Sequence, residues 1–89
     1  MGYTIYYRVE ITRWSEFVKF IKRICRGLGI GFELSGSYVV VTGEEAESLV
    51  IPPSGEGFVK TYGREPITSI YLLILYSISA FGSVLVWED

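Results

Sequence analysis

The chain lacks histidine, asparagine and glutamine altogether, and its 89 residues include a single aspartate at position 89. Without histidine, the usual general base at neutral pH is missing, and no serine or cysteine nucleophile has an imidazole partner. Oxygen-based metal sites usually draw on aspartate or asparagine as well as glutamate, so Glu44, Glu45 and Glu47 are better interpreted as an exposed acidic turn. We therefore expect a protein that is not an enzyme, with no catalytic residue, no cofactor and no bound metal.

Cysteine and methionine are also scarce, with one residue of each. The single Cys25 excludes an intrachain disulfide and falls on the apolar side of a predicted helix, where a small buried side chain is expected. The segment from Met1 to Thr4 contains no basic leader, which favours a cytoplasmic location. Depletion of asparagine, glutamine, cysteine and methionine is a trend of hyperthermophile proteins, so it favours a thermophilic, archaeal source.

The charge balance does not indicate a nucleic-acid partner, because eight basic and ten acidic residues give a formal net charge of −2. The outward face of the first predicted strand carries Tyr6 and Arg8, which resemble the interleaved aromatic and basic residues of RNA-binding sheets, but the aromatic motif of such domains is absent. The basic residues that cluster on one face of the first predicted helix are Arg13, Lys19, Lys22, Arg23 and Arg26. We expect this basic face to be solvated and nucleic acid not to be a partner.

The residues that are present predict a strand followed by a helix. Residues 3–11 alternate with a period of two, as a half-buried strand does. Apolar residues then recur at spacings of three and four up to Leu28, which predicts an amphipathic helix with Thr12 as its N-cap. Glycines in the segment 27–32 have the spacing of a dinucleotide-binding loop, but they follow a helix and precede a strand, the reverse of that motif. We interpret them as the signal that ends the helix.

The middle of the chain predicts four short strands separated by turns. A hairpin is expected over residues 32–42, and two further strands are expected at 48–51 and 58–62, with a loop at 52–57. A second helix and a last strand follow. This order predicts a single α+β domain over residues 1–89, a two-layer sandwich whose mostly antiparallel sheet carries both helices on one face.

The segment 67–87 is 21 residues long and contains no charge. As one helix it would rise about 31 Å, enough to cross a bilayer, so a membrane-anchored protein is one alternative. Gly82 divides the segment, however, and the residues after it are rich in β-branched side chains. We therefore predict a helix over Ile67–Phe81 followed by a strand, both covered by protein rather than by lipid.

The predicted second helix is apolar around most of its circumference. Side chains on one side can face the sheet, whereas Leu72, Leu73 and Tyr76 point elsewhere. Because an apolar helix is normally buried all round, these three residues predict a contact between copies of the chain, most simply a two-fold homodimer. The leading hypothesis is a small non-catalytic binding or assembly module that is homo-oligomeric through this helix.

One loop ahead of the second helix predicts a different function. Lys60, Thr61, Tyr62 and Arg64 bring two cations and two hydroxyl groups close to the positive end of the predicted helix, where a phosphate or carboxylate could bind. In this alternative the protein is a small regulatory domain with an anionic ligand. The competing interpretation is that the cations form ion pairs with nearby glutamates, as exposed cations often do.

Overall fold

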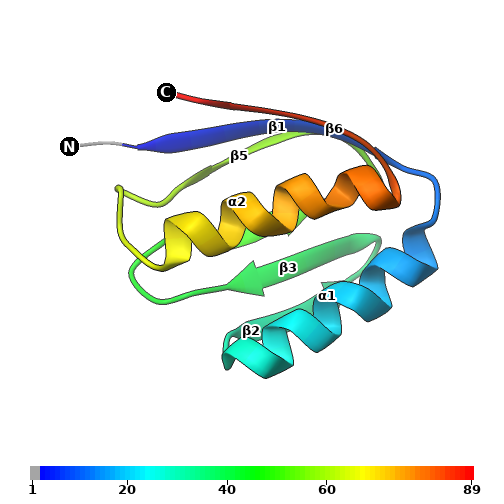
Figure 1. The fold of residues 1–89 in the computed structure, drawn as a ribbon, viewed down its shortest axis with the longest axis horizontal. Coiled ribbons are helices and arrows are strands. Elements are labelled where there is room, and N and C mark those ends of the chain that lie inside the picture. Colours follow the sequence, from blue (N-terminus) through cyan, green and yellow to red (C-terminus); the bar gives the residue numbers. More distant parts are fainter. Residues whose placement is uncertain (1–2) are drawn as a thin grey trace.

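The computed structural model of this chain describes residues 3–89 and confirms the predicted α+β class and the predicted order of strands and helices (Figure 1). The elements are β1 (Thr4–Ile11), α1 (Trp14–Leu28), β2 (Gly31–Ser35), β3 (Tyr38–Thr42), β4 (Leu49–Ile51), β5 (Ser54–Lys60), α2 (Ile67–Ser77), the 3₁₀ turn η1 (Ile78–Ala80) and β6 (Gly82–Glu88). Both helices lie over one side of the strands, with α2 along β1, β5 and β6 and α1 beside β2 and β3.

The strands form two antiparallel sheets of three strands each, in the orders β5-β1-β6 and β2-β3-β4. β1 is the central strand of the first sheet, so Tyr6 lies opposite both Phe58 of β5 and Trp87 of β6. Pro52 and Pro53, which have no N–H to continue a ladder, separate β4 of the second sheet from β5 of the first. The Pro53 carbonyl still accepts a hydrogen bond from the backbone N–H at the end of β1, at 2.8 Å.

The first strand supplies one side of the core, as its period of two predicts. The buried residues of β1 with apolar side chains are Ile5, Tyr7, Val9 and Ile11. The Tyr7 hydroxyl donates a hydrogen bond to the Val50 carbonyl in β4, which links the two sheets. Gly57 lies opposite Tyr7 in β5, and a Cβ at that position would come within 2.7 Å of the Tyr7 hydroxyl oxygen. A glycine is therefore needed there to leave room for the buried ring.

Helix α1 packs through Phe17, Ile21 and Cys25, and its basic residues are exposed on the opposite side. The predicted N-cap is wrong: the cap position is Arg13, and no side chain makes a capping hydrogen bond. The hydroxyl of Thr12 instead donates to the carbonyl of Phe81, at 3.2 Å. The predicted C-terminal stop is confirmed, because the residue after Leu28 adopts a left-handed conformation with φ of 72°.

The β5 strand is longer than predicted. Residues 54–57, expected in a loop, pair with β1, and the strand ends at Lys60 rather than at position 62. The physical reason is that β1 offers an unpaired edge over its full length, so even a glycine-rich segment gains backbone hydrogen bonds there. Tyr62 has a positive φ of 57°, which is incompatible with continuing the strand.

The chain turns at Gly82, as predicted for the uncharged segment. The regular helix covers Ile67–Ser77, a short 3₁₀ turn extends it to Ala80, and β6 then returns along β1. A Cβ at Gly82 would lie 2.0 Å from the Glu10 carbonyl oxygen, so only glycine fits this crossing. Among residues 3–89, none of the helices has the length and apolar character needed to cross a membrane.

Candidate functional site

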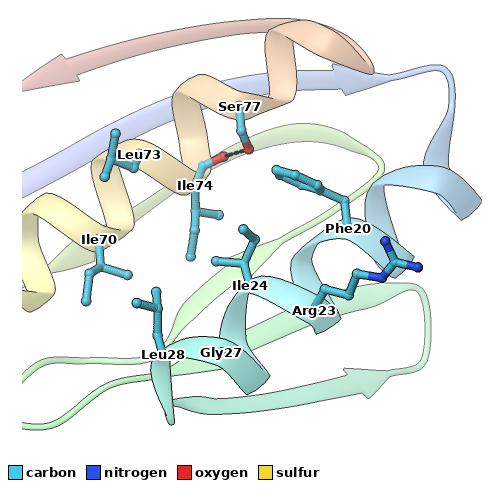
Figure 2. Close-up of a pocket in the computed structure, with 9 residues that line it drawn as sticks. All are labelled: Phe20, Arg23, Ile24, Gly27, Leu28, Ile70, Leu73, Ile74 and Ser77. Carbon is cyan, nitrogen blue, oxygen red and sulfur yellow. Dashed lines mark hydrogen bonds between the residues drawn. The ribbon is translucent and has the colours of Figure 1, made fainter.

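An apolar hollow lies between the two helices (Figure 2). Its volume is about 470 Å³, and apolar side chains from both helices converge on it. Figure 2 shows Ile24 and Leu28 of α1 facing Ile70 and Ile74 of α2. The residues that line the groove are Phe20, Arg23, Ile24, Gly27, Leu28, Ile70, Leu73, Ile74 and Ser77. We call this hollow the interhelical groove.

Beside the groove, helix α2 presents an uncharged outer stripe. The inner side of α2 is buried against the sheets through Tyr71, Ile74 and Leu75. Exposed residues recur on the other side at spacings of four, three and four, at Ser69, Leu73 and Tyr76 of α2 and at Ala80 of the η1 turn that follows it. We call these four residues the α2 stripe. It contains two of the three residues predicted to form a contact between copies.

The three predicted contact residues differ in their exposure. Leu73 is 70% exposed and Tyr76 is also exposed, so both extend from the surface. Leu72 is half-buried and packs against the edge of the core. The structure therefore brings Leu73 and Tyr76 together on the outer surface of α2, whereas Leu72 also contributes to the fold of the single chain.

The electrostatic surroundings of the stripe are mild. No residue of α2 carries a charge, and Arg23 is the one charged residue among those that line the interhelical groove. The other basic residues of α1 lie on its outer side, away from its buried Phe17, Ile21 and Cys25. An apolar partner can therefore cover α2 without removing a charged group of that helix from water, a step that would cost free energy.

Three groups with ionisable side chains are buried in the core, at Tyr7, Tyr71 and Cys25. Burial raises the pKa of Tyr7 to about 12, and burial also raises the pKa values of Tyr71 and Cys25. All three therefore stay protonated near neutral pH. The Tyr71 hydroxyl accepts a hydrogen bond from the Gly43 N–H at 3.1 Å and lies 2.9 Å from the Glu47 carbonyl oxygen. These contacts attach α2 to the connection between β3 and β4.

The loop predicted to bind an anion does not present its four side chains together. Thr61 is fully buried, and its hydroxyl accepts a hydrogen bond from that of Thr68 at 2.8 Å. Lys60 and Tyr62 are exposed, and Arg64 lies 3.7 Å from a carboxylate oxygen of Glu45. The Arg64 pairing corresponds to the ion-pair interpretation of this loop.

The start of α2 already has a carboxylate of its own. Glu65 accepts hydrogen bonds from the backbone N–H of Ser69 at 3.0 Å and from its hydroxyl at 3.1 Å. This carboxylate satisfies one of the free N–H groups that would otherwise attract an anion. Within residues 3–89, no three acidic, cysteine or histidine side chains converge as they would around a metal ion.

A second exposed surface was not predicted as a site. On the outer face of the β5-β1-β6 sheet, the rings of Phe58, Tyr6 and Trp87 form a row across three strands, with centroid distances of 6.2 and 6.0 Å. We call these three residues the aromatic row. The sequence indicated that Tyr6 points outward, but only the pairing register shows that two more aromatic rings flank it.

Comparison with protein-family models, with curated protein sequences and with solved structures finds no match for this chain. Inference about function therefore depends on the chemistry of the two exposed apolar surfaces, the α2 stripe with its groove and the aromatic row.

Proposed function

We propose that this protein is a non-catalytic assembly module whose α2 stripe packs against the same stripe of a second copy. The observation that supports this most directly is Leu73, which is 70% exposed at the centre of an uncharged helix surface. Contiguous apolar surface on a small soluble chain is typical of a contact with another protein. A second copy is the simplest partner, because a two-fold contact requires only one self-complementary surface.

The energetics favour burial of this stripe. Removing a leucine or aromatic side chain from water contributes about 1.5–3 kcal/mol. In a two-fold contact every residue counts twice, so Leu73 and Tyr76 together represent four buried side chains. This gain offsets part of the entropy that two chains lose on association, which is at least about 4 kcal/mol.

The spacing of the stripe suits the packing of two α2 helices against each other. Positions 69, 73, 76 and 80 form one stripe along α2 and the η1 turn. Rows of side chains spaced by three or four residues pack into the grooves of a neighbouring helix, with axes about 8–10 Å apart. Ser69 and Ala80 are small, so the ends of the two helices can approach closely. Leu73 borders the interhelical groove, which offers apolar surface to the partner's side chains.

The test is a single charge placed in the stripe. Leu73→Glu would bury a carboxylate at each contact, so we expect it to lower the molar mass measured by light scattering. Leu34→Glu is a matched control, because Leu34 is an exposed leucine on β2, outside both the stripe and the groove. Since both leucines are exposed, circular dichroism should show that both variants keep the native fold.

Two results would contradict the proposal. One is a parent chain that already has the 10.1 kDa mass of a single copy. The other is a Leu73→Glu variant with the mass of the parent. Flotation with anionic vesicles provides a further check, because a single-copy chain that binds vesicles through Leu73 would show that lipid, and not a second copy, covers the stripe.

A further inference from the structure

The outer face of the β5-β1-β6 sheet is unusually apolar for an exposed surface. In an antiparallel sheet with one face on the core, the other face is normally polar. Here Tyr6, Phe58 and Trp87 lie directly opposite one another in the pairing register. Leu85 lies two positions before Trp87 in β6, on the same face of the sheet, and is paired with Arg8 of β1. In Figure 1 these strands run along the upper side of the molecule, with both helices below them.

The apolar part of this face has the size of an interface core. Phe58 is 59% exposed, Leu85 is 60% exposed and Trp87 is 47% exposed. Because each aromatic side chain has about 150–250 Å² of surface, these residues together expose roughly 300–400 Å². That is about half of the 800 Å² that each partner contributes to an interface of standard size, and a polar rim normally supplies the rest.

The charges around the aromatic row determine which partner fits. Alternation along the strands places two basic residues, Arg8 and Lys60, and two acidic residues, Glu10 and Glu56, on the same face. Arg8 and Glu56 are neighbours on paired strands and form an ion pair. A nucleic-acid strand requires an excess of positive charge to neutralise its phosphates, and this face has none. A face that carries both signs can instead be complementary to itself.

We infer that the aromatic row packs against the same face of a second copy, sheet on sheet, about a two-fold axis. Stacked sheets pack about 10 Å apart, a distance that interlocking aromatic side chains fill. In such a contact the basic residues of one copy can approach the acidic residues of the other. This surface is independent of the α2 stripe, because α2 covers the opposite side of the same sheet.

The experiment compares four chains by light scattering: the parent, Leu73→Glu, Leu85→Glu and the double variant. If the sheet face joins two copies, Leu73→Glu alone retains a mass of at least twice 10.1 kDa, and adding Leu85→Glu reduces it to 10.1 kDa. A Leu73→Glu chain that is already a single copy overturns the inference. A Leu85→Glu chain that is a single copy supports the sheet contact and removes the proposed α2 contact, so the two failures are distinguishable.

Fluorescence gives a second, local measurement. In a Trp14→Phe background Trp87 is the sole tryptophan. Its emission should shift to shorter wavelength as the chain concentration rises, because association removes the indole from water. Emission that stays the same over concentrations at which the measured mass changes contradicts the inference. Saturable quenching by oligouridine also contradicts it, because that result would show that a nucleic-acid strand occupies the aromatic row.

Discussion

Tyr7 connects the two sheets through one buried hydroxyl group. Its ring lies under Gly57, and its hydroxyl donates to the Val50 carbonyl. Burial raises the pKa of Tyr7 to about 12 from its ordinary value of 10.0, because the phenolate would lose its hydration. The folded chain thus holds this proton more tightly than the unfolded chain does. The associated stability is complete below pH 10 and is lost as the pH rises to about 12.

We predict that Tyr7→Phe changes the response of stability to alkaline pH. Near neutral pH the variant should be less stable by about 1–3 kcal/mol, because the Val50 carbonyl loses its partner. Above pH 10 the parent should lose up to about 3 kcal/mol that the variant does not lose, since two pKa units correspond to that amount. Urea unfolding at a series of pH values measures both effects.

Tyr38→Phe is the matched control for this experiment, because Tyr38 is exposed. It should follow the parent across the whole pH range. If the parent and Tyr7→Phe lost stability in parallel above pH 10, the hydroxyl of Tyr7 would not be the group that titrates. Tyr71 and Cys25 also have raised pKa values, and they contribute equally to both chains.

Single residues also show where sequence patterns cannot predict a contact. Thr12 is the type of residue that caps helices, and its position before the helix favoured that role. Its hydroxyl instead bonds to Phe81, 69 positions away in the chain. Arg13 reaches the same region, with its backbone N–H donating to the Phe81 carbonyl at 3.0 Å. A long-range partner thus replaces the local one, and no local pattern contains that information.

At the scale of elements, the predictions succeeded where one periodicity was strong. The period of two in β1 and the spacing of apolar residues in α1 identified both elements and their buried faces. The prediction for residues 54–57 was wrong. Their two glycines and their polar residues indicate a loop, whereas in the structure they form a strand that pairs with the edge of β1. Pairing with a distant strand depends on register, which the sequence of one strand does not specify.

The candidate surfaces divide in the same way. The α2 stripe could be predicted in part. Helical spacing shows which side chains of an apolar helix face away when one side packs on a sheet. The aromatic row could not, because it draws one ring from each of three strands that are far apart in the sequence. The loop predicted to bind an anion does not present Thr61 at the surface, because this side chain is buried in the core. Its hydrogen bond with Thr68 depends on the folded structure and could not be predicted from the sequence of the loop.

The connection between α2 and β6 gives a prediction at this scale. Gly82→Ala would place a Cβ 2.0 Å from the Glu10 carbonyl oxygen, so the backbones of β1 and β6 must separate. We expect a loss of at least the 1–3 kcal/mol that overpacking usually costs. Chemical denaturation monitored by circular dichroism measures this change in the free energy of unfolding.

Gly27→Ala is the matched control, since Gly27 lies within α1 and a Cβ there meets no atom within 4 Å. It should raise stability by about 0.5–1 kcal/mol, because alanine favours helix more than glycine does. If Gly82→Ala were as stable as the parent, the close crossing of β1 and β6 would not be a constraint on this fold.

At the scale of the whole molecule, the apolar surplus of the sequence is divided between a core and two exposed surfaces. The chain exposes 5329 Å², close to the roughly 5,300 Å² expected for a monomer of 10.1 kDa. Its total surface is therefore that of an ordinary monomer of this size. The α2 stripe and the aromatic row lie on opposite sides of one sheet, so the two proposed contacts would use different faces of a single copy.

The central claim is that a second copy covers the α2 stripe, and sedimentation equilibrium of the Leu85→Glu chain tests it most directly. This variant should remove the proposed sheet contact, and it leaves Leu73 and Tyr76 unchanged. We predict a molar mass of twice 10.1 kDa, with the native circular dichroism spectrum retained. A folded Leu85→Glu chain with a mass of 10.1 kDa at every concentration would contradict the claim.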